Sequence, residues 1–260
     1  RRTLADHPRG CARRLVRRDE EGGVVTAPYY QDEWVTLYHG EALDVMSELE
    51  RGSFAHCVTD PPYILQAGSS SQRGSKTGGW ADMMNSAHWY ATWFRQVGAL
   101  IGHHGSAWVF GNWRSLPVYQ RAAIDSDLAA ASLLVWDKEW IGPGGPQQLR
   151  SQHETCLLLC REGFKQPDRG QGDVLRVKVG SHKPTGHPAE KPVRLMRRVL
   201  ELSGANPGDL ILDPFAGSGT VSVAAKELGL RSVAIEYEER WCEVAAKRLA
   251  ADVLDFGEPA

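Results

Sequence analysis

Short apolar runs alternate along the chain with segments whose apolar residues recur every three or four positions. The first pattern is typical of buried strands and the second of amphipathic helices. The predicted strands are 34–39, 54–59, 106–110, 131–136, 154–160, 174–179, 210–212 and 232–235. The predicted helices are 42–49, 89–100, 113–125, 193–202, 217–228 and a last one that ends near Leu249. This alternation predicts an α/β fold, Rossmann-like, with a mainly parallel sheet and helices on both faces.

The domain organisation follows from where this alternation stops. Residues 1–32 lack a steady period and are predicted to form a basic, flexible N-terminal arm. Residues 33–260 are predicted to form a single domain. Within it, residues 64–79 are rich in Ser and Gly and predict a loop, and residues 161–188 are polar, basic and interrupted by Gly and Pro.

Composition narrows the class of protein. The chain is 42% hydrophobic and 24% charged, as in ordinary globular proteins. It contains no apolar run of about 18 residues, so we expect no membrane span. Its five cysteines are odd in number and scattered, which indicates a reducing, cytoplasmic compartment. Cys156 and Cys160 stand in an apolar run, so we interpret them as part of a buried strand, and we expect no metal site.

Charge is unevenly distributed, although the formal net charge is only −2. Residues 1–18 hold seven Arg and one Asp, and residues 161–198 hold ten Lys or Arg against four acids. Clustered basic residues can form a local patch that binds nucleic acid, and a solvated surface or tail is the alternative. We take Arg169, Arg176 and Lys178 as candidate contacts.

A first motif follows the predicted strand 210–212. It reads Asp213-Pro-Phe215-Ala216-Gly217-Ser218-Gly219-Thr220 and leads into a helix. Glycines in such a turn let the backbone approach a ligand closely. The next strand ends at Glu236, and an acid about 20 residues beyond the turn can bind the ribose hydroxyls of an adenosine cofactor. The spacing fits neither the NAD fingerprint nor the ATP-binding P-loop, and a plain start of a helix is the alternative.

A second motif, Asp60-Pro61-Pro62-Tyr63, follows the strand 54–59. Two prolines stiffen the backbone, so the Asp60 carboxylate and the Pro61 carbonyl are acceptors on a rigid turn. Tyr63 places an aromatic face beside them. Acceptors next to an aromatic ring suit a flipped base that carries an amino group, and an ordinary surface turn is the alternative.

Both motifs come directly after apolar strands. The carboxyl ends of parallel strands meet at one edge of an open α/β sheet, where ligands bind. We therefore expect the two motifs to form one site.

Together these motifs resemble those of the amino-group DNA methyltransferases. The resemblance covers roughly residues 34–250 and includes the segment His187-Pro-Ala-Glu-Lys191-Pro192, which in that family closes over the methionine end of the cofactor. It implies S-adenosylmethionine as cofactor, bound by residues 213 and 215–220, Glu236 and Lys191, and it implies catalysis by residues 60–63. Glu41 stands where the family often has Asp, and the pairs at 137–138 and 153–154 match pairs that we interpret as structural.

The order of the motifs is informative, because the catalytic motif precedes the cofactor motif. This order resembles the β class of DNA methyltransferases, which act on a flipped base of double-stranded DNA, as in restriction–modification. The opening Asp60 favours adenine N6 over cytosine N4. The alternatives are an RNA or protein-glutamine methyltransferase and a binding module without catalysis.

The resemblance also implies where the target sequence is recognised. The family carries much of its target recognition between the two motifs, so we assign residues 161–188 to that role. Residues 64–86 and 112–150 are further candidates, as is a second subunit in a homodimer.

Overall fold

The structure is a computed structural model that describes residues 16–18, 24–62, 87–142, 149–180 and 183–251. The strands are β1 Val16–Arg18, β2 Val24–Thr26, β3 Tyr30–Gln31, β4 Val35–His39, β5 Phe54–Thr59, β6 Ile101–Gly111, β7 Ala129–Asp137, β8 His153–Cys160, β9 Val174–Arg176, β10 Leu210–Asp213 and β11 Arg231–Glu236. The helices are α1 Ala42–Ser47, α4 Ala87–Leu100, α5 Leu116–Ile124, α6 Val193–Ser203, α7 Thr220–Glu227 and α8 Glu239–Ala250.

Nine strands form one sheet in the order β3-β4-β11-β10-β5-β6-β8-β7-β9. The pairs β4/β11, β11/β10, β10/β5, β5/β6 and β7/β9 are parallel. The pairs β3/β4, β6/β8 and β7/β8 are antiparallel. The sheet is thus mixed but mainly parallel, as the sequence predicts.

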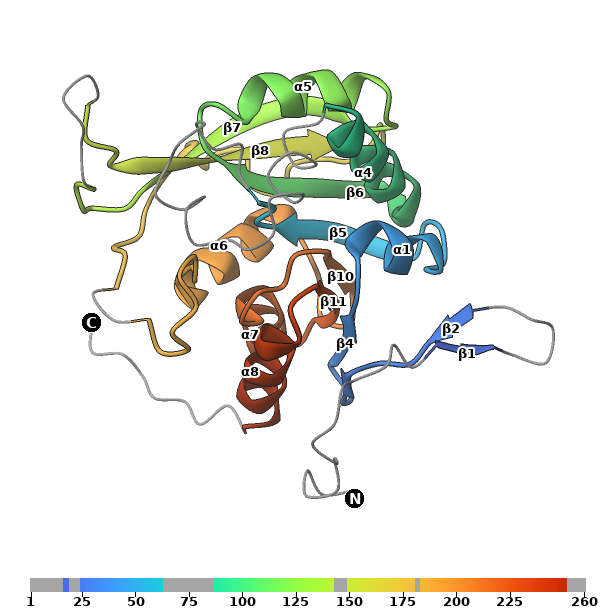
Figure 1. The fold of residues 1–260 in the computed structure, drawn as a ribbon. Helices are drawn as coiled ribbons and strands as arrows, with labels where there is room; N and C mark the ends of the chain where they lie inside the picture. The colour runs from blue at the N-terminus through green and yellow to red at the C-terminus, as the bar shows by residue number, and fades with distance from the viewer. Residues whose placement is uncertain (1–15, 19–23, 63–86, 143–148, 181–182, 252–260) are drawn as a thin grey trace.

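Helices cover both faces of this sheet. In Figure 1, α4 and α5 lie on one side of the strands, and α6 and α7 lie on the other. Neighbouring residues of one strand serve the two faces in turn: Cys57 packs in the core under α4, and Val58 packs in the core under α6 and α7. This alternation of side chains is what a strand buried on both faces requires.

The register brings several strand ends to one edge. β4, β11, β10, β5 and β6 all end there. Because β8 runs antiparallel to β6, its first residues lie at the same edge, with Thr155 opposite Gly111. Asp137 at the end of β7 pairs with His153, and Arg176 at the end of β9 pairs with Asp137. We call this edge the catalytic edge, because residues 60–62, to which the resemblance implies a catalytic role, follow β5 there.

The N-terminal prediction needs one correction. Residues 30–32 were assigned to the flexible arm, but β3 pairs with β4. Asp32 accepts hydrogen bonds from the Trp34 and Val35 N–H groups at 2.8 and 2.7 Å and lies 3.3 Å from the Lys226 ammonium. A strand of two residues leaves no periodic pattern, so its pairing depends on contacts that the sequence does not display. β1 and β2 pair in a separate two-stranded sheet.

Candidate active site

The turn after β5 is held from two sides. The Asp60 side chain is 18% exposed, and its carboxylate accepts a hydrogen bond from the Lys191 ammonium group. The Pro62 carbonyl accepts a 2.8 Å hydrogen bond from the Tyr90 hydroxyl of α4. Tyr63 lies outside the described residues. The turn therefore presents a fixed carboxylate at the catalytic edge.

Asp60 belongs to a buried network of four charges. The Lys191 ammonium, 7% exposed, also lies 3.2 Å from a Glu154 oxygen. The other Glu154 oxygen lies 3.5 Å from the Lys138 ammonium. Burial alone lowers the pKa of Lys191, but the carboxylates of Asp60 and Glu154 outweigh it and leave the pKa raised. The resemblance assigns Lys191 to the cofactor, whereas in the structure its ammonium contacts the Asp60 carboxylate.

The two sequence motifs meet through a direct hydrogen bond. Asp213, at the end of β10, is 2% exposed. One of its oxygens accepts a 2.7 Å hydrogen bond from the Thr59 hydroxyl and a 3.2 Å one from the Phe215 N–H. Burial, with smaller contributions from the charges of Asp60 and Glu236, raises the pKa of Asp213 to about 7, although both hydrogen bonds act against the shift.

The glycine turn has the geometry of a ligand-binding loop. Gly217 and Gly219 have φ of 53° and 79°, the left-handed region that glycine occupies without strain. A Cβ atom added to Gly217 would lie 3.3 Å from the His187 ring, so a larger residue would crowd segment 185–191. The Ser218 hydroxyl is buried and, within the described part of the chain, has no hydrogen-bond partner.

Glu236 closes the other side of this turn. One carboxylate oxygen accepts a 2.8 Å hydrogen bond from the Gly217 N–H, and the other accepts a 2.7 Å one from the Glu238 N–H. Burial raises the pKa of Glu236, and these backbone donors oppose the shift. An acidic side chain thus lies at the end of β11 directly beside the loop, as the spacing predicted.

An ion pair joins segment 185–191 to the glycine turn at residues 213–220, which we call the cofactor loop because the resemblance implies that it binds the cofactor. The Arg248 guanidinium of α8 lies 3.2 Å from Glu190 and donates to the Ser218 carbonyl at 3.3 Å and the Thr220 hydroxyl at 3.2 Å. Glu190 also accepts a 2.6 Å hydrogen bond from the Thr185 hydroxyl. Because Lys191 follows Glu190, this pair helps to place the ammonium on Asp60.

Aromatic side chains of α4 pack against Phe215 of the cofactor loop. The Phe215 ring centre lies 5.7 Å from that of Trp89 and 5.5 Å from that of Trp93. The Ala216 N–H donates a 2.9 Å hydrogen bond to the Ile235 carbonyl. Trp89 and Trp93, from the predicted helix 89–100, therefore also hold this loop through Phe215.

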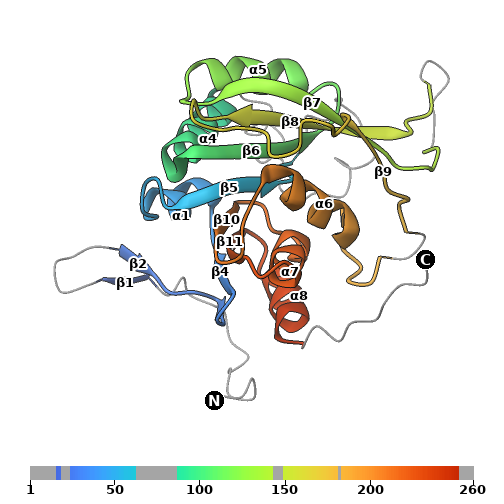
Figure 2. The same ribbon diagram turned by 180° about the vertical axis from the view of Figure 1, so that it is seen from behind.

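The structure separates the three candidate DNA contacts. Arg176 ends β9 at the catalytic edge, and the exposed Lys178 follows it. Arg169 lies elsewhere: its neighbours Pro167 and Gln171 contact Gly204 and Arg198, at and near the far end of α6. Segment 161–173 runs across the sheet from the end of β8, as Figure 2 shows, so Arg169 does not join this edge.

Sequence reasoning missed residues whose role depends on partners far along the chain. From the sequence we interpret the pairs with Lys138 and Glu154 as structural, and we make no assignment for Thr59, Tyr90 or Arg248. Among these residues, the sequence could have indicated a role only for Glu154, because a charged residue at the start of an apolar strand needs a partner.

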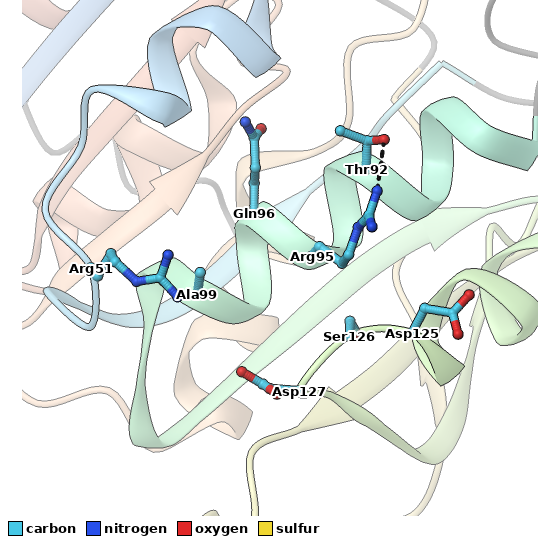
Figure 3. Close-up of a pocket in the computed structure, with 8 residues that line it drawn as sticks. All are labelled: Arg51, Thr92, Arg95, Gln96, Ala99, Asp125, Ser126 and Asp127. Atoms are coloured by element: carbon cyan, nitrogen blue, oxygen red, sulfur yellow. Dashed lines mark hydrogen bonds between the residues drawn. The ribbon is translucent and has the colours of Figure 1, made fainter.

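A pocket of about 420 Å³ lies at the opposite edge of the sheet. Figure 3 shows the residues that line it. They are Arg51 in the turn before β5, side chains on the outer face of α4, and the turn before β7. Its side chains include Arg51, Arg95 and Asp127, and Asp127 pairs with Arg161 at 2.9 Å. Neither motif contributes a residue to the lining of this pocket, so the pocket is distinct from the catalytic edge.

The sequence profile of the DNA methylase family matches residues 54–247, which include both motifs. The chain belongs to the DNA methylase family. It is therefore an S-adenosylmethionine-dependent enzyme that methylates an exocyclic amino group of DNA bases, which confirms the fold, activity and cofactor that the sequence implied.

Relatives of this methylase span nearly its whole length. It is 26% identical over 257 residues to the type II methyltransferase M2.DpnII of Streptococcus pneumoniae, covering 89% of this chain and 96% of the relative. It is 27% identical over 247 residues to the type II methyltransferase M2.MboI of Moraxella bovis, covering 85% and 90%. Among solved structures, the cytosine-N4-specific PvuII DNA methyltransferase superposes with a TM-score of 0.70 at 16% identity, covering 90% and 91%.

The residues of this methylase fit S-adenosylmethionine. The fit rests on a loop with two left-handed glycines, a buried Ser218 hydroxyl without a partner among the described residues, and acids at the ends of β10 and β11. The Glu236 carboxylate lies directly beside the loop on the Gly217 N–H, which suits a cofactor that carries ribose hydroxyls. None of the described helices is long and apolar enough to cross a membrane.

The raised pKa of Asp213 predicts a specific dependence of stability on pH. The folded state, in which the pKa of Asp213 is about 7, keeps a proton on this carboxyl up to about pH 7, whereas the unfolded chain releases it near the ordinary value of 3.8. Asp213 therefore makes the free energy of unfolding fall as pH rises from about 4 to about 7. We expect the free energy of unfolding of Asp213→Asn not to decrease in this way, so that the variant gains stability relative to the wild type as pH rises across that window. Thermal unfolding of the apoprotein at several pH values measures it, and parallel curves would contradict the assignment.

Proposed function

We propose that this methylase methylates adenine N6 in double-stranded DNA, with Asp60 and the Pro61 carbonyl as acceptors for the two N–H bonds of a flipped adenine. The observation that carries the proposal is the position of the Asp60 carboxylate. It follows Thr59, which bonds to Asp213 of the cofactor strand, and the buried Lys191 ammonium holds it.

The chemical problem is the weak nucleophilicity of the amino nitrogen, whose lone pair is conjugated into the ring. Two acceptors on a rigid turn would tilt this nitrogen toward tetrahedral geometry and free its lone pair. S-adenosylmethionine supplies the electrophilic methyl group. Asp60 also stabilises positive charge that develops on the nitrogen, and most of the rate enhancement would come from positioning and electrostatics.

The remaining residues have supporting roles in this proposal. Tyr63 stacks on the flipped base, and Lys191 orients Asp60. Asp213, residues 215–220 and Glu236 hold the cofactor. The preference for adenine rests on Asp at position 60. A homodimer and a cytoplasmic location stay predictions.

A substrate made by PCR tests the choice of base. DNA synthesised with N6-methyl-dATP in place of dATP should accept no tritiated methyl groups from S-adenosylmethionine. DNA synthesised with N4-methyl-dCTP should accept them at the rate of ordinary DNA. The reverse pattern would assign the enzyme to cytosine N4.

A further inference from the structure

Large apolar side chains are exposed on the loops of the catalytic edge. Trp113 follows β6 and is 63% exposed, and Trp140 follows β7 and is 50% exposed. Ile141 and Leu149 belong to the same β7–β8 hairpin and are 47% and 98% exposed. Exposed tryptophans at such an edge indicate a binding surface, because a large aromatic side chain is more stable when it is buried than when it faces water.

These side chains are held in place rather than left loose. The Arg114 guanidinium lies 4.2 Å from the centre of the Trp113 ring. The hairpin beyond β7 is pinned by Arg150, which donates to the Gly142 carbonyl at 2.8 Å and to the Ile141 carbonyl at 3.1 Å. In Figure 1 the ends of β7 and β8 that carry this hairpin extend beyond the ends of the neighbouring strands.

Backbone strain marks the same hairpin. Glu139 has φ of 50°, and it is the one residue other than glycine with positive φ among the described residues. Such a conformation persists where the surrounding structure requires it, and it is common at ligand sites. Here it turns the chain between Asp137, at the end of β7, and Trp140.

Charge on these loops favours a polyanion. Arg114 and Arg150 lie on these loops. Arg176 ends the neighbouring strand β9 and is 76% exposed, and the exposed Lys178 follows it. The acids among these residues are mostly paired. Glu154 is paired with two lysines, and Asp137 accepts hydrogen bonds from the Glu139 N–H and the Gln152 amide and lies 4.0 Å from the Arg176 guanidinium. Glu139 is exposed. The exposed side chains are therefore mainly aromatic and basic.

We infer that the β6–α5 turn, residues 138–142 and 149–152 at the ends of β7 and β8, and the end of β9 form the surface that binds duplex DNA, with Trp113 and Trp140 as aromatic contacts and Arg114 and Arg176 as phosphate contacts. The inference rests on the proposed function and names the residues that bind its substrate. Four strand spacings separate β5 from β9, about 19 Å. The surface therefore starts beside Asp60 and is wide enough to contact a duplex around a flipped base. Aromatic side chains stack on bases or wedge between them, and Arg and Lys neutralise phosphates.

The aromatic part is tested with the double variant Trp113→Ala/Trp140→Ala. We expect its affinity for a fluorescein-labelled duplex of mixed sequence to fall at least tenfold by fluorescence anisotropy. Its affinity for S-adenosylmethionine should stay unchanged, and Trp113→Phe/Trp140→Phe should bind DNA within about threefold of the wild type. Ile124→Ala is the matched control, since Ile124 is 67% exposed at the far end of α5.

The basic part is tested by the dependence of DNA affinity on salt. Arg176→Ala should lower the slope of log affinity against log salt by about one, because one phosphate contact is lost. Arg169→Ala should leave the slope unchanged.

The outcomes separate this inference from the proposed function. If the wild type transfers methyl groups to DNA but the tryptophan double variant binds DNA with unchanged affinity, this inference is wrong and the proposed function stands. If the double variant instead changes the oligomeric state in light scattering while DNA affinity holds, the surface binds a second copy of the chain, which also overturns the inference. A wild type that methylates no DNA would refute the proposed function itself.

Discussion

Asp60→Ala is expected to lower kcat for methyl transfer to DNA by about a thousandfold or more while the Kd for S-adenosylmethionine stays within about threefold. The substitution removes the acceptor that orients the amino group and stabilises its developing charge. The cofactor loop keeps its own hydrogen bonds, from Phe215 to Asp213 and from Gly217 to Glu236. Single-turnover transfer of tritiated methyl groups and calorimetric titration of the cofactor measure the two quantities.

The matched control for Asp60→Ala is Asp125→Ala, which removes a carboxylate at the pocket on the opposite edge. It should leave both quantities at the wild-type level. Turnover of Asp60→Ala within tenfold of the wild type would show that Asp60 is not the catalytic acceptor.

Lys191→Met is expected to reduce both activity and stability. Its ammonium is nearly fully buried between Asp60 and Glu154, so its loss leaves two carboxylates close together without a shared cation. Breaking such a buried pair costs about 3–5 kcal/mol of unfolding free energy. We also expect kcat to fall roughly a hundredfold, since Asp60 loses the group that orients it.

The pH profile separates a positioning role of Lys191 from a merely structural one. Without the cation the neighbouring carboxylates are harder to ionise, so the apparent pKa on the acidic limb of kcat/KM should move to higher pH. Lys191→Arg should restore part of the activity. Lys138→Met is the control, because Lys138 contacts Glu154 but not Asp60 among the interactions of this network. An unchanged acidic limb in a folded Lys191→Met variant would limit Lys191 to a structural role.

Most of the fold could be predicted from the sequence because its strands are short apolar runs between amphipathic helices. The strand at 54–59 and the helix after Pro192 begin where the pattern places them. β6 begins at Ile101, five residues before the predicted strand, because its polar first residues Gly102, His103 and His104 hide the pairing of Ile101 with Phe54. Short pairings such as β3 with β4 depend on tertiary contacts that periodicity does not carry.

The site could be predicted only where its residues are local in sequence. The turns at 60–62 and 213–220 are contiguous, and the rule that parallel strand ends share an edge was enough to bring them together. The charge network joins residues 60, 138, 154 and 191 from separate strands and a loop, so the sequence could not show that Lys191 faces Asp60. The sequence could likewise not show that Arg169 lies away from Arg176, because a basic segment of sequence does not form one surface when the chain crosses the sheet.

The most direct test of the central claim is to incubate the protein with tritiated S-adenosylmethionine and unmethylated duplex DNA, digest the DNA to nucleosides and identify the labelled product by mass spectrometry. We predict N6-methyladenine from the wild type and no labelled nucleoside from Asp60→Ala. Labelled N4-methylcytosine as the sole product would contradict the assignment of adenine, and equal labelling by the wild type and Asp60→Ala would contradict the catalytic site.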